Sequence, residues 1–399
     1  TRARLSKVPG LLQQAAENID HIPRAYYDAS LNMIHDTRRY LEWLAQDANL
    51  TDMRVEFDEA LNALVRFNRW VQALTPRPDA ACAVPSLDAS LAEHFLISDS
   101  PDDIFQRAQV QWFLNLEKLK QLASQIDPLN TWLQLYHDFS PAEGRGLDTL
   151  SLYRHEVEKL IDFFSNNGFR PQDLAAALAL AETPLYLQSV RSSASFSAAL
   201  SADAGEQSFF YITVPKESNA KTDNGRLQQR LHREYKYLTA HETIPGHHVL
   251  DSFRRDSKNP IRQQVESPLF YEGWATYVET LLTEQGYITR PIEILVDYKR
   301  RLWRCARCMI DVGLPTRRLT KAEAHGLLIE VGFSETEAKT QVARFQLNPG
   351  YQLCYFLGRS EILRLRDIFT KHHGSASFHA FILEGGQLPF GLILSLIHI

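Results

Sequence analysis

The sequence predicts a mostly α-helical fold with one small β-sheet beside a helix that carries candidate metal ligands. Most of the 399 residues fall in segments whose apolar residues recur at three- and four-residue spacing, the period of an α-helix. Residues 208–215 are instead rich in aromatic and β-branched residues and close with a proline, which is typical of a strand. The helical pattern that resumes after this strand contains a cluster of histidines, so the sheet and the cluster are expected to be neighbours.

Four helices are expected before the strand. Their apolar periodicity covers residues 24–46, 57–74, 101–126 and 150–164. The third has a clear start signal, because Ser100 can cap the helix and Pro101 suits its first position. Proline- and alanine-rich residues lead into it, and a glycine-containing loop precedes the fourth helix.

Helical periodicity dominates again after the strand. It covers residues 225–243 and 269–286, the segments after Pro291 and Thr320, and residues 350–369. We expect an N-terminal helical region, residues 1–200, and a second region, residues 201–393, that holds the histidine cluster, with the two forming one compact unit.

Composition and charge exclude several functions. The net charge is −5 and the isoelectric point is near 6.3, so no basic surface for nucleic acid is predicted. The apolar runs are short and interrupted, so no membrane span is expected.

Both ends of the sequence have unusual features. The chain opens on Thr1, inside amphipathic sequence and with no signal peptide, so we expect residues to be missing before it. The last six residues, 394–399, match the in-frame translation of a transposase-end sequencing adapter, and we expect them to be foreign to the protein.

The histidine cluster reads HETIPGHH over residues 241–248. Zinc hydrolases need three protein ligands, an open position and a carboxylate that accepts a proton from water. Ligands four residues apart share a helix face, whereas His241 and His247 are six apart. We predict that Pro245 and Gly246 make a two-residue bulge that returns His247 to the required face. His248 is the rival ligand, but two full helical turns separate it from His241, so His247 is preferred and His248 is expected to be a polar neighbour.

A third ligand is expected from the next helix, which reads EGWATYVE over residues 272–279. Glu272 is the candidate, and Gly273 would let this helix approach the histidine helix closely. Glu279 lies seven residues further on the same face, which suits a residue that orients a ligand histidine.

The spacing leaves other interpretations open. His241 and His247 could be a core histidine pair on a kinked helix, with Glu272 in a solvated ion pair. A structural zinc site would need a fourth protein ligand, for which His248 or Glu279 is available. Cys305 and Cys308 have C-x-x-C spacing, but they lie within a helical pattern and not at a helix start, so a redox role is disfavoured.

These motifs resemble a family of bacterial proteins, domain of unknown function 885. The likeness rests on HETIPGHH (241–248), EGWATYVE (272–279) and NPGYQLCYFLG (348–358), and weaker similarity covers nearly the whole chain. The family resembles zinc peptidases whose third ligand is a glutamate. The resemblance therefore implies a zincin-like core, zinc on His241, His247 and Glu272, and Glu242 as general base.

Two departures from the family pattern accompany this resemblance. The family's Asp-x-Gly-Leu-His motif ends here in Pro315, and a glutamine common after the final Pro-Gly step is replaced by Tyr351. The first departure bears on substrate contacts more than on metal binding. Family relatives are often exported, so the resemblance also raises export as an expectation.

The chemistry expected of this site is peptide hydrolysis by a zinc-activated water. Tyr355, or else Tyr351, would donate to the developing oxyanion, and Arg344 would bind a substrate carboxylate. The strand 208–215, taken as an edge strand, would hold an extended peptide. The alternatives are a metal hydrolase of non-peptide amides and a non-catalytic helical protein with a structural or degenerate metal site.

Overall fold

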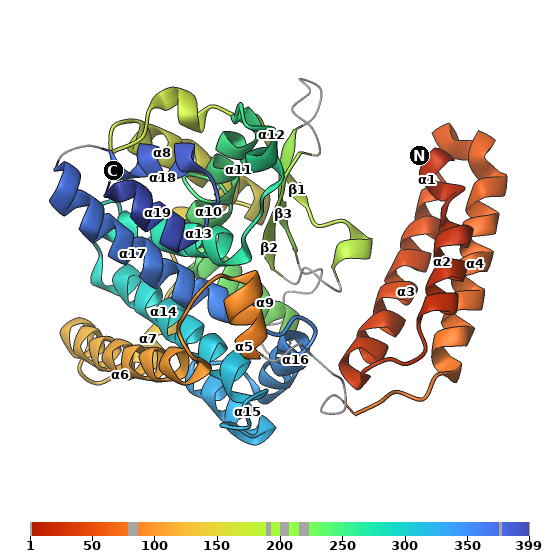
Figure 1. The fold of residues 1–399 in the computed structure, drawn as a ribbon, viewed down its shortest axis with the longest axis horizontal. Coiled ribbons are helices and arrows are strands. Elements are labelled where there is room, and N and C mark those ends of the chain that lie inside the picture. The colour runs from red at the N-terminus through yellow and green to blue at the C-terminus, as the bar shows by residue number, and fades with distance from the viewer. Residues whose placement is uncertain are drawn as a thin grey trace. The chain divides into compact units, whose positions relative to one another are not determined.

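The computed structural model describes residues 2–78, 87–188, 193–199, 207–214, 223–374 and 377–398. The chain is mostly helical with one three-stranded sheet, as the sequence predicts (Figure 1). It divides into two compact units, Thr1–Val84 with Thr183–Ser192, and Pro85–Glu182 with Ser193–Ile399. The predicted division near residue 200 differs from this one, because helices after Pro85 share a core with the C-terminal part and a short later segment joins the first unit.

The first unit is a set of helices with its own core. Phe57 and Val71 pack against Ile34 and Leu41 in one apolar cluster. Tyr186, from the short segment that joins this unit later in the chain, packs on Tyr40 with ring centroids 4.6 Å apart. Its helices are α1 (Arg2–Leu5), α2 (Val8–Asn18), α3 (Arg24–Leu44) and α4 (Arg54–Ala73).

The second unit contains the sheet and the remaining helices. Its strands are β1 (Leu178–Glu182), β2 (Ala194–Ser197) and β3 (Ser208–Ile212). Its helices are α5 (Leu87–Ala89), α6 (Pro101–Ile126), α7 (Trp132–Asp138), α8 (Thr149–Ser165), α9 (Asp223–Arg233), α10 (Tyr235–Glu242), α11 (His247–Asp256), α12 (Pro260–Gln264), α13 (Pro268–Glu284), α14 (Pro291–Gly313), α15 (Lys321–Glu330), α16 (Glu335–Phe345), α17 (Leu353–His373), α18 (Phe378–Gly385) and α19 (Phe390–Ile397).

Local sequence signals explain several helix ends. The predicted start of α6 is confirmed, since the Asp103 amide donates to Ser100 Oγ and the two residues form a capping box. The single helix predicted over residues 225–243 is instead two helices, α9 and α10, which meet at Glu234. Helix α19 includes four of the six residues expected to be adapter sequence, and Ile399 lies outside the described residues.

The sheet has the strand order β1-β3-β2, with β3 parallel to β1 and antiparallel to β2. The prediction that strand 208–215 is an edge strand is therefore wrong, because β3 is paired on both sides. Its terminal Pro215 lies outside the described residues. Strands β1 and β2 form the two edges of this sheet, and the sequence patterns singled out neither of them.

The sheet lies against the helix that carries His241. Phe210 and Ile212 of β3 are buried and share an apolar cluster with Tyr153 of α8 and Tyr235 of α10. The larger core of this unit joins α6, α13, α14 and α17. The histidine helix thus lies between a sheet and a helical layer, and both fix its position.

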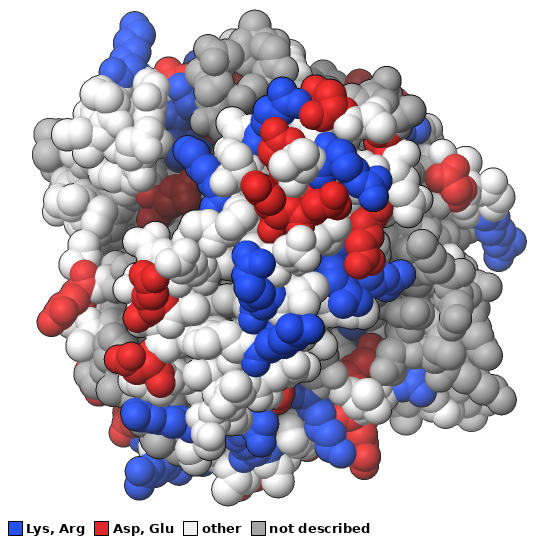
Figure 2. Space-filling model, turned by 90° about the vertical axis from the view of Figure 1, so that its right-hand side faces the viewer, with Lys and Arg blue, Asp and Glu red and all other residues white. Residues whose placement is uncertain are grey.

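On the face shown in Figure 2, basic and acidic side chains are interspersed and neither sign forms an extended patch. Within the described residues, none of the helices has the length and apolar character needed to cross a membrane.

Candidate metal centre

His241 and His247 are brought together by a break between two helices. Helix α10 ends one residue after His241, and α11 begins at His247. The predicted two-residue bulge in one continuing helix is therefore wrong. Pro245 has no amide to continue the helical ladder. Gly246 passes so close to the end of α10 that an added Cβ would lie 1.9 Å from the His241 carbonyl oxygen, so no other residue fits there.

Three buried side chains converge at this break. His241, His247 and Glu272 each offer one ligand atom, and these atoms all lie within 4.8 Å of one another. Glu272 Oε2 lies 3.4 Å from His241 Nε2 and 3.5 Å from His247 Nε2. No described residue donates a hydrogen bond to this oxygen. Burial alone would raise the pKa of Glu272, but the two imidazoles hold it well below its usual range.

The other oxygen of Glu272 is held by two phenols. Tyr351 donates to Oε1 over 2.5 Å, and Tyr355 donates to the same atom over 2.7 Å. Burial raises the pKa of both phenols, and the charge of Glu272 raises it further. The two tyrosines therefore fix the carboxylate and leave Oε2 directed at the histidines. Both residues that the sequence assigned to the oxyanion are thus in contact with a predicted ligand.

Glu242 lies beside this group and contacts the sheet edge. Its Oε2 accepts a hydrogen bond from the Phe196 amide of β2 over 2.7 Å. Burial raises the pKa of Glu242, against the opposing charges of His241 and His247. The carboxylate is thus positioned by main chain and is close enough to the histidines for their charges to act on it.

Each histidine ring is also oriented by a neighbour. Glu279 Oε1 lies 2.8 Å from His241 Nδ1, the ring nitrogen opposite the one that faces Glu272. The His247 ring stacks on Tyr271 with centroids 3.8 Å apart and an angle of 14° between the planes. Burial would lower the pKa of His241, but Glu272 and Glu279 raise it to about 9.

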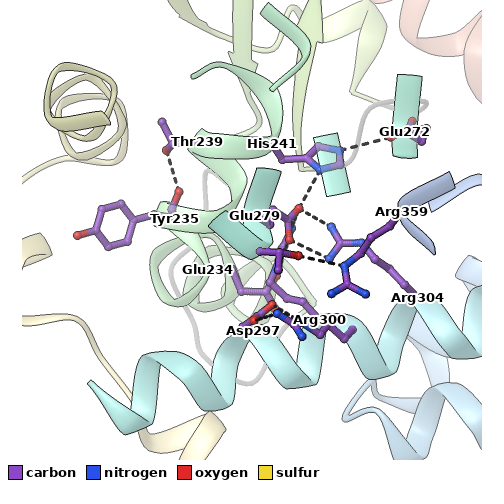
Figure 3. Close-up of polar contacts among 12 residues, drawn as sticks. Glu234, Tyr235, Thr239, His241, Glu272, Glu279, Asp297, Arg300, Arg304 and Arg359 are labelled. Carbon is purple, nitrogen blue, oxygen red and sulfur yellow. Dashed lines mark hydrogen bonds and ion pairs between the residues drawn. The ribbon is translucent and has the colours of Figure 1, made fainter. Parts of the chain in front are cut away.

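Glu279 belongs to a buried charged network with Glu234, Arg300 and Arg304 (Figure 3), which Lys299 joins through Glu234. Arg300 and Arg304 each donate to both oxygens of Glu279, over 2.5–3.1 Å. Arg300 also donates to Glu234, which accepts from Lys299 as well. Burial would raise the pKa of Glu279, but the two arginines hold it well below its usual range. The network keeps a charged carboxylate against His241.

Helix α13 approaches α17 and not the histidine helix at Gly273. A Cβ added to Gly273 would lie 2.6 Å from the carbonyl carbon of Gly358 on α17. The prediction that Gly273 admits the histidine helix is therefore wrong. The contact with the histidine segment comes from the next residue, since Trp274 Nε1 donates to the Pro245 carbonyl over 2.9 Å.

The remaining two predicted site residues are His248 and Arg344. His248 Nε2 is 3.0 Å from the Ala176 carbonyl, and burial lowers the pKa of this histidine. Arg344 is half-buried near Arg307 and Tyr355, and burial together with the charge of Arg307 lowers its pKa. Its role toward a substrate carboxylate stays a prediction.

Residues on α14 were missed by the sequence interpretation. Arg300, Arg304, Arg307 and Asp311 recur at three- and four-residue spacing in a helix read only for its apolar face. Asp311 accepts from the Gly350 and Leu353 amides and so fixes the start of α17 beside Tyr351. Charged residues that recur at this spacing among the apolar residues of one helix are the signal that could have identified them.

The surroundings of the C-x-x-C pair disfavour a redox role. Cys305 and Cys308 are buried free thiols within α14. Burial raises the pKa of Cys305 to about 12 and that of Cys308 well above its ordinary value. A redox-active thiol needs a depressed pKa, so this alternative finds no support.

Comparison with known proteins identifies the family. The sequence profile described as bacterial protein of unknown function (DUF885) matches residues 1–397, so the chain belongs to this family. No curated protein matches the sequence.

Two solved structures share the fold. One is a candidate lipoprotein from Colwellia psychrerythraea, 20% identical with a TM-score of 0.73, in which the match covers 90% of this chain and 65% of that one. The other is a candidate lipoprotein of unknown function from Shewanella oneidensis, 21% identical with a TM-score of 0.74, covering 100% of this chain and 77% of that one. The chain thus spans less than two thirds of the first of these proteins.

Proposed function

We propose that this member of the DUF885 family is a zinc-dependent peptidase with a zincin-like core that holds the metal on His241, His247 and Glu272. The observation that carries the proposal is the position of Glu272 Oε2, 3.4 and 3.5 Å from the two imidazole Nε2 atoms and with no hydrogen-bond donor among the described residues. Two imidazoles and one carboxylate form the ligand set of catalytic zinc sites, which keep a position open for water or substrate.

The residues around the proposed site favour a catalytic zinc ion over a structural one. A structural zinc ion needs a fourth protein ligand. His248 directs Nε2 at the Ala176 carbonyl, and both oxygens of Glu279 accept from arginines. Neither residue belongs to the group whose ligand atoms lie within 4.8 Å of one another, which is His241, His247 and Glu272.

Zinc bound by these three residues would supply a Lewis acid toward a peptide carbonyl and would lower the pKa of a water molecule. Glu242 accepts the proton from that water and later delivers it to the leaving amine. The Phe196 amide bonds Oε2 of Glu242, so Oε1 is the oxygen assigned to the proton. Burial raises the pKa of Glu242, which makes its carboxylate a stronger base toward that proton.

The tyrosines have two candidate roles in this proposal. Tyr355 remains the predicted donor to the oxyanion, with Tyr351 as the second choice. Both phenols donate to Glu272 Oε1, so either one would have to leave this oxygen to serve a substrate. The other phenol would continue to hold the carboxylate.

The edge strand β2 is the proposed support for an extended peptide. The Thr213 amide donates to the Ser193 carbonyl across the β2–β3 ladder. In an antiparallel pair, the main-chain N–H and C=O groups of every second residue bond the partner strand, and those of the residues between point away from it. The main-chain groups of Ala194 and Phe196 therefore point away from β3, on the side where Phe196 meets Glu242. A peptide paired with this edge would pass beside the proposed base.

The test is metal content together with turnover on a peptide mixture. We expect about one zinc per chain, lost in His241→Ala, and cleavage that Glu242→Gln abolishes while its zinc is retained. Activity retained in Glu242→Gln would contradict the mechanism. Zinc binding without cleavage of peptides or of non-peptide amides would favour the structural or degenerate site, and cleavage of the amides alone would favour the other hydrolase class.

The proposed location is outside the cytoplasm. Support comes from the names of the two structural neighbours, which are candidate lipoproteins. Fractionation of cells that make the natural full-length protein tests this, and recovery in the cytoplasmic fraction alone would contradict it.

A further inference from the structure

Two adjoining cavities lie away from the three-ligand group, between α6, α13, α14 and α17. The larger has a volume of about 1280 Å³ and the smaller about 500 Å³. Both are lined by Lys118, Tyr298, Arg301 and Arg359, so they meet at these four residues. None of the candidate metal ligands lines either cavity.

Most charged residues of these walls already have partners. Arg107 pairs with Asp99 and Glu361, and Arg364 also pairs with Glu361. Arg301 donates to Asp297, and Glu284 pairs with Arg366. Asp103 accepts from Ser100 at the start of α6, and Asp367 is exposed. These contacts account for most of the charged side chains that line the two cavities.

Two cations at the junction differ from the rest. Arg359 is half-buried, and its only hydrogen bond or ion pair within the described residues is the bond from Nε to Thr280 Oγ1 over 3.0 Å. Its two terminal nitrogens therefore have no acceptor among these residues. Lys118 is half-buried on the facing side of α6 and forms no ion pair or hydrogen bond with a described residue.

The charge of Arg359 is also poorly compensated. Burial and the nearby charges of Arg301 and Arg304 outweigh Asp297 and lower the pKa of Arg359 to about 10. The guanidinium remains protonated at neutral pH. A guanidinium offers paired donors that match a carboxylate or a phosphate, and a bound anion would satisfy them.

The walls of the larger cavity add an apolar surface. Val110 and Leu114 of α6 line it and are 57% and 58% exposed. Phe356 and Leu363 of α17 line it as well. Exposed apolar side chains gathered beside a cavity are typical of a binding surface.

We propose that the joined cavities bind a small organic anion, with its carboxylate or phosphate head between Arg359 and Lys118. Its apolar chain lies in the larger cavity beside Val110 and Leu114. The residues that would bind the head are close to the metal centre in sequence, because Arg359 follows Gly358 and its partner Thr280 follows Glu279. The site itself requires neither zinc nor catalysis.

The experiment is calorimetric titration of the metal-free chain with octanoate, octyl phosphate and octyltrimethylammonium. We expect the two anions to bind saturably at one site and the cation not to bind. Loss of a charge-assisted hydrogen bond should make Arg359→Gln bind octanoate about tenfold more weakly. Lys118→Gln should also weaken binding, and Lys120→Gln, an exposed change on the same helix, should leave it unchanged.

Several outcomes would overturn the proposal. Equal binding of the cation would show a purely apolar surface, and unchanged affinity in both Arg359→Gln and Lys118→Gln would remove the assigned head-group site. Loss of octanoate binding in His241→Ala would place the anion at the metal centre. If Arg359→Gln does not fold, Lys118→Gln decides the outcome, since its side chain is half-buried on the surface of α6.

Discussion

Gly273 on α13 and Gly358 on α17 meet backbone to backbone. A Cβ added to Gly358 would lie 2.7 Å from the Gly273 Cα and 2.1 Å from the Leu269 carbonyl oxygen. Helix α13 carries Glu272 and α17 carries Tyr355, whose phenol donates to that glutamate. The contact between the two glycines therefore sets the distance between a candidate metal ligand and the residue that holds it.

Gly358→Ala should separate α13 from α17. The new methyl group meets backbone atoms that cannot move away alone, so we expect destabilisation of about 1–3 kcal/mol. We also expect weaker zinc binding, because Glu272 and Tyr355 shift with the two helices. The measurements are thermal unfolding and competition for zinc with a chelator. Gly326→Ala is the matched control, since Gly326 is helical and its added Cβ meets nothing within 4 Å. A Gly358→Ala protein as stable as this control would contradict the assignment.

Arg304→Gln should weaken metal binding through Glu279. Arg304 donates to both Glu279 oxygens, and Glu279 contacts His241. Changes of this kind behind a ligand histidine typically cost about 10–100-fold in metal affinity. Chelator competition measures the affinity, and circular dichroism checks that the fold is kept, as we expect from the remaining Arg300 contact.

The matched control for this prediction is Arg301→Gln. Arg301 is the neighbouring arginine on α14, but it pairs with Asp297 and makes no contact with Glu279. We expect its zinc affinity to equal that of the unmodified chain. Equal losses in the two variants would show that helix α14 as a whole is affected and that the Glu279 contact has no specific role.

The buried carboxyl of Glu156 should make stability fall as pH rises. Burial raises the pKa of Glu156 to about 7, despite the hydrogen bond from Tyr287 and the charges of Lys236 and Lys159, and Glu143 adds to the increase. Unfolded, the group titrates near 4.5. Between these values the folded state binds more protons, so its free energy of unfolding decreases with rising pH, by up to about 3 kcal/mol from this group.

Urea unfolding at pH 5 and pH 7 checks this pH dependence. Glu156→Gln cannot lose a proton, so its stability relative to the unmodified chain should increase between the two values. Asp162→Asn, an exposed change on the same helix, should follow the unmodified chain at both. A constant difference between Glu156→Gln and the unmodified chain would show that Glu156 is already charged at pH 5.

The sequence predicted most helices because their apolar faces have the helical period. It also singled out His241, His247 and Glu272, because residue type and motif order are visible along the chain. It could not predict the break at Gly246, since the approach of that residue to the His241 carbonyl depends on the three-dimensional path. For the same reason Gly273 was assigned to the wrong neighbouring helix.

Other features depend on partners far away in the chain. The central position of β3 follows from pairing with β1 and β2, whose short sequences carry little alternating pattern. Arg300 and Arg304 are read as ordinary surface charges until Glu279 and Glu234 are brought beside them. Long-range pairing, and not local propensity, thus accounts for what was missed.

The roles of Tyr355 and Tyr351 can be separated by their phenylalanine variants. Both phenols donate to Glu272 Oε1, so each change removes one hydrogen bond from the ligand. If Tyr355 is the oxyanion donor, Tyr355→Phe should lower kcat by about 10²–10³-fold with little change in zinc affinity. Tyr351→Phe should mainly weaken zinc binding and leave kcat of the loaded enzyme near normal. Steady-state kinetics at saturating zinc, beside chelator competition, measures both quantities. The reverse pattern would transfer the oxyanion role to Tyr351, and a loss of zinc affinity in both variants with unchanged kcat would leave both tyrosines as supports of Glu272.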